Sequence, residues 1–97
     1  MRAVVARLQV RWEECFFWAT HQGAELDLLV VRGRQRLAFE FKRTAAPRVT
    51  PSMHIAKKDL ELPLLRVVHP GDHTFRMGTG IAAVALSDLE SCLRPLR

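Results

Sequence analysis

The 97-residue sequence has no apolar run close to the roughly 20 residues that a membrane-spanning helix requires. Its N-terminus, MRAVVARLQVRWEE, is charged throughout and lacks the apolar core of a signal peptide. These two absences predict a cytoplasmic protein with no membrane partner. Repeats, linkers and low-complexity segments are absent too, so we expect residues 1–97 to form a single domain with one core.

Cysteine and histidine are both scarce. Cys15 and Cys92 are too few for a disulfide framework and too far apart for a zinc knuckle, so we interpret them as reduced thiols in or near the core. Of the four histidines, only His69 and His73 flank one Pro-Gly loop, and no third histidine or cysteine lies close by. The spacing therefore favours surface or loop histidines over a structural zinc site.

Basic residues outnumber acidic ones. The chain has 15 Lys and Arg against 10 Asp and Glu, which gives a net charge of +5 and a pI of about 10.2. Such a balance favours contact with a polyanion, and nucleic acid is the leading candidate. The arginines are scattered rather than clustered, so an ordinary basic domain remains an alternative. A hydrophobic content of 48% is typical of a globular protein.

Hydrophobic periodicity predicts strands and helices in the order α-β-β-β-α-β-β-α, an α/β class with a mixed sheet flanked by helices. Thr50 and Pro51 favour a helix start, as do Ser87 and Glu90 in a capping-box spacing. The expected helices cover residues 2–12, 52–61 and 87–96. The expected strands cover residues 15–21, 24–31, 36–43, 64–69 and 81–86, with a polar loop at 72–80.

The second and third strands form a hairpin whose register is set by its connection. If Arg32 pairs with Gln35, then Asp27 faces Glu40 and Glu25 faces Lys42. The opposite face of the hairpin is wholly apolar and must be buried. Its members are Leu26, Leu28, Val30, Leu37, Phe39 and Phe41.

The pairing of Asp27 with Glu40 is the feature that indicates chemistry. Directly opposed residues have Cβ atoms about 5 Å apart, so two carboxylates there repel unless a cation lies between them. Magnesium or manganese held by Asp27, Glu40 and the main-chain carbonyl of Phe41 would activate a water for phosphodiester hydrolysis. Lys42 would position that water or stabilise developing charge, and Glu25 would reach the water shell or hold Lys42. The alternative is a solvated sheet edge with a Glu25–Lys42 pair worth about 0.2–1 kcal/mol.

At these residues the chain resembles the PD-(D/E)XK nuclease superfamily, through HQGAELDLLV followed by LAFEFK. More closely, it is similar to the C-terminal domain of unknown function of a group of bacterial and archaeal AAA-type ATPases. That likeness runs from about residue 11 to the end, through FFWATHQGAELDLLV, FEFKRTAAPRVTPSM, RVVHPG and ALSDL. It implies a restriction-endonuclease-like fold in which Asp27 is the metal-binding acid and Glu40 and Lys42 are the acid-x-Lys pair.

The sequence departs from that family at two points. It has no Walker A glycine-rich loop, so this chain is not the ATPase itself. The superfamily's first helix often supplies another glutamate, whereas Glu13 and Glu14 lie too near the first strand to replace it. The chain thus resembles a truncated or standalone version of an ATPase-linked domain, with a separate ATPase or a second copy as possible partners.

The helix after the hairpin adds weaker candidates. In a nuclease-like fold its first residues can approach the active site, so Ser52, His54 or Lys57 could contact substrate phosphate. An exposed helix face is the more common outcome for such residues. The sequence therefore favours a magnesium-dependent nuclease, or a nucleic-acid-binding derivative of one. The rival hypothesis is a catalytically inactive interaction or regulatory domain derived from an AAA-type ATPase.

Overall fold

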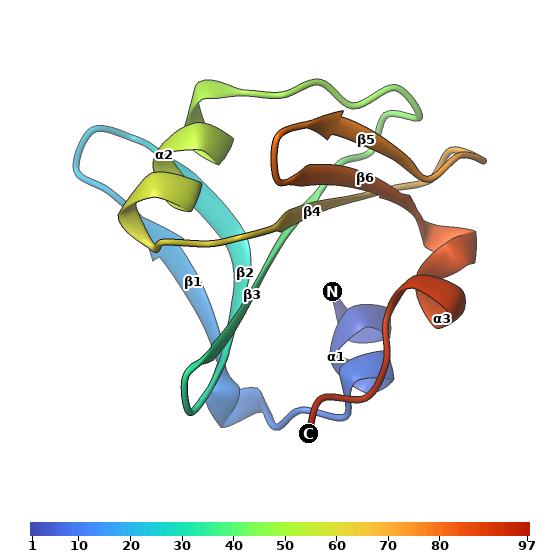
Figure 1. Ribbon diagram of the computed structural model, residues 1–97, viewed down its shortest axis with the longest axis horizontal. Helices are drawn as coiled ribbons and strands as arrows, with labels where there is room; N and C mark the ends of the chain where they lie inside the picture. Colours follow the sequence, from blue (N-terminus) through green and yellow to red (C-terminus); the bar gives the residue numbers. More distant parts are fainter.

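A six-stranded mixed sheet forms the centre of the structure, a computed structural model that describes residues 1–97 (Figure 1). Strands β3, β4 and β6 are parallel to one another, and the remaining pairings are antiparallel. The spatial order is β1-β2-β3-β4-β6-β5. In sequence the strands are β1 (Cys15–Ala19), β2 (Glu25–Arg32), β3 (Gln35–Phe41), β4 (Leu65–His69), β5 (Phe75–Gly78) and β6 (Ile81–Ala85).

Short helices cover both faces of this sheet. The α-helices are α1 (Arg2–Leu8), α2 (Pro51–Asp59) and α3 (Leu89–Cys92), and the 3₁₀ helices are η1 (Trp12–Glu14) and η2 (Leu86–Asp88). None of them is long and apolar enough to cross a bilayer. The expected mixed α/β sheet with flanking helices is confirmed.

Two hydrophobic clusters lie on opposite faces of the sheet, because side chains alternate along each strand. Helices α1 and α3 pack on the face that carries Phe39, Val68 and Val84. Helix α2 packs on the other face through Met53 and Ala56. The α2-side cluster also contains Leu26, Leu29, Ala38, Leu62, Leu65, Val67 and Ile81.

Three predictions for the second half of the chain are wrong. Residues 75–78 form strand β5 rather than a loop, because they pair antiparallel with β6 through a turn at Gly80. The last helix is much shorter than predicted, since Leu93 is already extended and Arg94 precedes a proline. Ser87 does not cap a helix, because it lies inside η2.

A β-bulge in β2 overturns part of the predicted hairpin face. Phe16 pairs with Leu29 and Trp18 pairs with Leu26, so two residues of β2 oppose Phe17. The extra residue of β2 is Asp27 or Leu28, and it reverses the side-chain alternation of the residues that precede it. Leu26 therefore joins the α2-side cluster, whereas Leu28 and Val30 lie on the opposite face as predicted.

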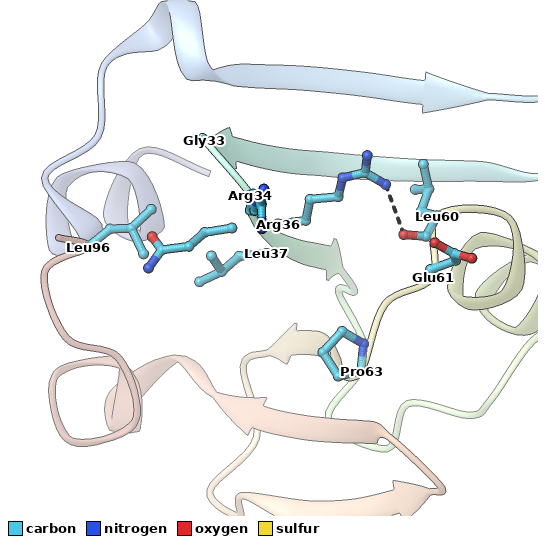
Figure 2. A pocket seen from close by; sticks show the side chains of 9 residues that line it. Gly33, Arg34, Arg36, Leu37, Leu60, Glu61, Pro63 and Leu96 are labelled. Atoms are coloured by element: carbon cyan, nitrogen blue, oxygen red, sulfur yellow. Dashed lines mark hydrogen bonds between the residues drawn. The ribbon is translucent and has the colours of Figure 1, made fainter.

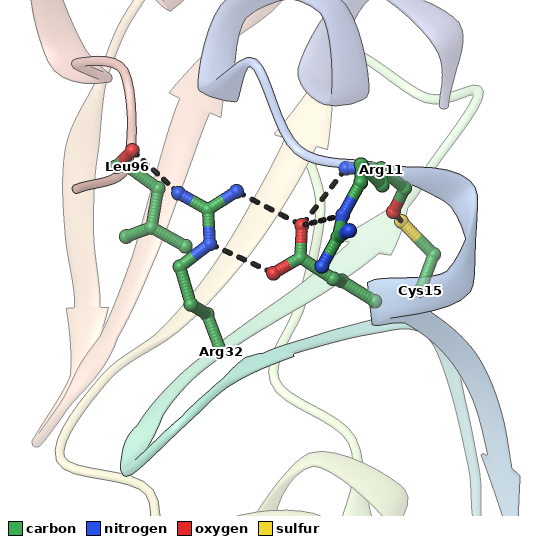
Figure 3. Close-up of polar contacts among 5 residues, drawn as sticks. Arg11, Cys15, Arg32 and Leu96 are labelled. Carbon is green, nitrogen blue, oxygen red and sulfur yellow. Dashed lines mark hydrogen bonds and ion pairs between the residues drawn. The ribbon is translucent and has the colours of Figure 1, made fainter.

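One arginine ties three distant segments together near the hairpin connection (Figure 3). Arg32 donates to Glu14 through Nε at 2.7 Å and Nη2 at 2.9 Å, and through Nη1 to the carbonyl oxygen of Leu96 at 2.7 Å. The Arg11 N–H also donates to Glu14 at 2.9 Å. These hydrogen bonds, led by those from Arg32, lower the pKa of Glu14 to about 2.

This network predicts a loss of stability in acid. Because the folded pKa of Glu14 lies below its ordinary value of 4.5, its ionised form stabilises the fold above that pH. This contribution should disappear as pH falls from about 4.5 to about 2. In urea unfolding at a series of pH values, Glu14→Gln should be less stable than wild type at pH 7 and match it near pH 2. Glu13 is the exposed neighbour of Glu14, and the control variant Glu13→Gln should have the same free energy of unfolding as wild type at every pH.

Candidate functional site

The register predicted for the hairpin is confirmed over its paired length. Arg32 lies opposite Gln35, and the pairing continues without a shift to Leu28 opposite Phe39. The main-chain ladder of β2 and β3 ends there, one residue before Asp27 and Glu40. The next contacts between the two strands are made by these two side chains.

Two hydrogen bonds hold Asp27 and Glu40 next to each other, and in each of them a carboxylate accepts a main-chain N–H of the other strand. The Asp27 N–H donates to Glu40 Oε1 at 2.9 Å, and the Phe41 N–H donates to Asp27 Oδ2 at 2.9 Å. Each carboxylate thus accepts a main-chain donor from the opposite strand, just beyond the last paired residues of β2 and β3. Both carboxylates are held as neighbours, each with a fixed orientation.

These carboxylates lie in a hollow of about 330 Å³ beside the start of α2. Glu40 is only 8% exposed, and Asp27 is half-buried. Thr50 caps α2 by accepting the Met53 N–H at 3.4 Å, which confirms the predicted helix start and places the first turn at the wall of the hollow. The lining residues are Gly23, Glu25, Asp27, Glu40, Phe41, Lys42, Thr50 and Ser52.

Lys42 is the cation that contacts the carboxylate pair. Its Nζ lies 3.6 Å from Glu40 Oε2. Burial nevertheless raises the pKa of Glu40 above its ordinary value, and the charge of Asp27 raises it further. The Asp27 N–H and Lys42 act in the opposite direction without cancelling the effect. The protein therefore compensates the buried charge only in part.

The donor set suits a hard divalent cation that keeps water ligands. Asp27 Oδ1 makes no hydrogen bond in the protein, and Glu40 Oε2 contacts only Lys42. No group of three or more His, Cys, Asp or Glu side chains is arranged to hold a metal ion. Magnesium commonly binds through one or two carboxylates together with waters and substrate phosphate, so Asp27, Glu40 and a main-chain carbonyl fit its requirements.

The remaining predicted site residues are only partly brought together. Glu25 lines the hollow but lies opposite Ala19, and Lys42 pairs with Glu40 instead of the expected Glu25. The bulge accounts for this difference, because it shifts the residues of β2 that precede it. Ser52 also lines the hollow.

His54 and Lys57 lie away from the hollow. His54 is exposed on α2. Lys57 Nζ donates to the carbonyl oxygen of Thr79 at 2.8 Å and so ties α2 to the turn between β5 and β6. The sequence did not indicate Gly23 or Thr50 as lining residues, because their positions depend on how the Gln22-Gly23 turn and α2 pack around the hairpin end.

Two predictions outside the site are wrong. His69 is a buried residue, since its Nε2 bonds to the carbonyl oxygen of His73 at 2.9 Å and its Nδ1 accepts the Gly71 N–H at 3.1 Å. Both ring nitrogens are therefore satisfied within the loop that follows β4. Cys92 is exposed rather than near the core, because α3 turns it outward, whereas Cys15 is half-buried as expected.

The largest cavity, of about 640 Å³, lies at the other end of the hairpin (Figure 2). Arg34 and Arg36 line it together with Glu61, and Arg36 Nη1 donates to the carbonyl oxygen of Leu60 at 3.1 Å. It contains neither Asp27 nor Glu40. Size alone therefore does not identify a functional site.

Comparisons with known proteins place the chain in a family. Residues 1–89 match the family described as a domain of unknown function (DUF4143). The uncharacterized proteins Mb2031c of Mycobacterium bovis and Rv2008c of Mycobacterium tuberculosis are each 42% identical over 69 residues, or 71% of this chain. The chain spans 16% of the length of each. No solved structure matches it. With nearly its whole length covered by that family's pattern, the chain belongs to the DUF4143 family.

Proposed function

We propose that the carboxylate hollow catalyses divalent-metal-dependent hydrolysis of phosphodiester bonds in nucleic acid, as a PD-(D/E)XK-like site on a restriction-endonuclease-like sheet. The proposal depends on the two hydrogen bonds that hold the Asp27 and Glu40 carboxylates next to each other at the end of the hairpin ladder. Two adjacent carboxylates repel one another, and a bound divalent cation would offset that repulsion. The +5 net charge of the chain suits a polyanionic substrate.

Each residue of the site has a role that its position supports. Asp27 and Glu40 would hold magnesium or manganese with the Phe41 carbonyl, and the bound ion would polarise the scissile phosphate and acidify a water. Lys42, 3.6 Å from Glu40, is placed to orient that water or to offset charge on the phosphate. Ser52 at the wall of the hollow can donate its hydroxyl to a phosphate oxygen.

A second candidate function is a non-catalytic interaction domain associated with an AAA-type ATPase. It is favoured by the outer edge of the sheet, where β1 has no neighbour on one side. Phe16 is 49% exposed, Phe17 is 64% exposed and the nearby Trp12 is 56% exposed. An uncharged edge strand flanked by exposed aromatic side chains is suited to pairing with another protein. The ATPase or a second copy of this chain would fill that role.

Cleavage of labelled single- and double-stranded DNA and RNA tests the leading proposal. Wild type with magnesium or manganese should cleave at least one substrate, whereas Asp27→Ala and Lys42→Ala should each lose about 100-fold or more. Lys58→Ala removes the same charge from an exposed position on α2 and should retain wild-type activity. Equal traces of activity in all four proteins would indicate contamination and exclude the enzyme.

A further inference from the structure

The open edge of β1 has the main-chain groups that another strand needs for pairing. β1 is the outermost strand on one side of the sheet and pairs only with β2 (Figure 1). Thr20, which follows β1, donates its N–H to the Ala24 carbonyl oxygen at 2.8 Å and therefore faces the β2 side. Because alternate residues of a strand present their main-chain groups to opposite sides, Phe17 and Ala19 present theirs to the open side.

β1 also lacks the features by which edge strands avoid pairing with another chain. Natural edge strands are commonly protected by charged residues, above all lysine, or by proline. None of the five residues Cys15–Ala19 is charged or a proline. Phe17, at the centre of the strand, is the most exposed large hydrophobic side chain of the chain. The edge is therefore apolar, unprotected and accessible.

The sequence of β1 complements itself when a second copy runs antiparallel to it. With Phe17 on a two-fold axis, Phe17 faces the second copy's Phe17, and Phe16 faces the second copy's Trp18. Phe16 and Trp18 lie on the α2 side of the sheet, because they pair with Leu29 and Leu26 of the α2-side cluster. Phe17 points to the opposite face. Aromatic pairs would thus form on both faces of the joined sheet.

The charges at the two ends of β1 match in the same arrangement. Glu13 lies two residues before the strand and His21 lies two residues after it, and both are exposed. Since antiparallel pairing places the start of one strand beside the end of the other, each Glu13 comes close to the second copy's His21. Glu13 is negative, and His21 can donate a hydrogen bond to it or carry a positive charge. The axis that pairs the aromatic side chains therefore also pairs complementary polar groups.

We propose that two copies of this chain associate through their β1 edges, in antiparallel orientation about Phe17, and form one continuous sheet. The Phe17 N–H of each copy donates to the Phe17 carbonyl oxygen of the other, and the Ala19 N–H donates to the Cys15 carbonyl oxygen. The partner at this edge is then a second copy of the chain rather than an ATPase. The dimer rests on the interaction role of the edge and not on the carboxylate hollow, to which β1 contributes no lining residue.

Sedimentation velocity over a range of protein concentrations tests the association. Two paired edge strands bury an area at the low end for stable interfaces, so we expect wild type to dimerise with a Kd in the micromolar range. Phe17→Lys places two like charges on the two-fold axis and should raise the dimer Kd by about 30-fold or more. Phe75→Lys makes the same change at an exposed position of β5, the other edge of the sheet, and should keep the wild-type Kd. A wild type that is still monomeric at about 500 µM would overturn the proposal, as would a dimer that only Phe75→Lys disrupts.

His21→Glu tests the register without changing an aromatic residue. It places a carboxylate beside the second copy's Glu13 at both symmetric contacts and should raise the dimer Kd by about threefold or more. His54→Glu is the matched control, because it makes the same substitution at an exposed position on α2 and should leave the Kd unchanged. Both variants lower the net positive charge of the chain equally, so a general charge effect would change both Kd values alike. Equal Kd values for the two variants would contradict the proposed register.

Association can be measured independently of the monomer's stability and of cleavage. Urea unfolding at concentrations well below the dimer Kd follows the monomer, in which Glu13 has no second copy beside it. A wild type that cleaves nucleic acid and stays monomeric would support the hollow and overturn the dimer. A dimer that the Phe17→Lys and His21→Glu variants weaken, but that cleaves nothing, would support the dimer and remove the enzyme.

Discussion

Glu40→Gln is expected to abolish magnesium-dependent cleavage, by about 100-fold or more, while the fold remains at least as stable as wild type. Glutamine has the length of glutamate, and its amide oxygen can still accept the Asp27 N–H that now donates to Glu40 at 2.9 Å. The charge is lost, and with it the ion pair to Lys42 and the ability to hold a divalent cation beside Asp27. Activity and stability should therefore change independently.

The stability effect follows from the raised pKa of Glu40. A carboxyl whose folded pKa lies above its ordinary value of 4.5 stabilises the fold while protonated, and that contribution is lost as pH rises through the folded pKa. Without metal, wild type should thus lose stability relative to Glu40→Gln between acid and neutral pH. Urea unfolding at pH 4 and pH 7 measures the difference.

Bound magnesium should make wild type more stable than Glu40→Gln. Magnesium at ten times its Kd would stabilise wild type by about 1.4 kcal/mol and leave Glu40→Gln unchanged. Glu90→Gln is the matched control, because Glu90 lies exposed on α3, on the other face of the sheet from the hollow, and should retain the magnesium response. A Glu40→Gln protein with a clearly lower Tm at pH 7 would show that the carboxylate is a structural group, which would remove the main support for a metal site.

The proximity of Asp27 and Glu40 could be predicted because a hairpin register follows from local information. The alternation of β2 and β3 and the short connection at Gly33 fix the register up to Leu28 and Phe39, and Asp27 and Glu40 come next and contact each other there. The Thr50 cap was likewise predictable, since a threonine before a proline marks a helix start. These features depend on neighbouring residues only, so tertiary packing did not change them.

The features that the sequence did not predict all depend on distant partners. The bulge near Asp27 arises in the pairing with β1, whose register shifts by one residue between Phe16 and Trp18, whereas the pairing with β3 is regular from Leu28 to Arg32. β5 is a strand because β6 offers it an edge, and the alternation within its four residues FRMG is too short to predict a strand by itself. Lys57 could not be assigned to Thr79 before the β5–β6 turn was known to reach α2.

That turn makes Gly80→Ala the most destabilising single substitution that we expect. Gly80 has φ +69°, a left-handed conformation that costs an alanine about 1 kcal/mol. A Cβ there would also lie 2.7 Å from the carbonyl oxygen of Pro63 and would collide with Lys57 Nζ. Because a backbone atom cannot move away as a flexible side chain can, the total cost should be about 2–4 kcal/mol. Thermal unfolding should show a Tm lower by about 10 °C or more.

Gly33→Ala separates the two parts of that cost. Gly33 has φ +58°, but a Cβ there meets nothing within 4 Å, so it should lose only the conformational term of about 1 kcal/mol. Equal losses of stability in the two variants would show that the contact with Pro63 is not restrictive.

The β5–β6 turn at Gly80 also affects the carboxylate hollow, because Lys57 joins this turn to α2, whose first turn forms the wall beside Asp27. Gly80→Ala should therefore weaken magnesium binding even where the protein is still folded, whereas Gly33→Ala should leave it intact.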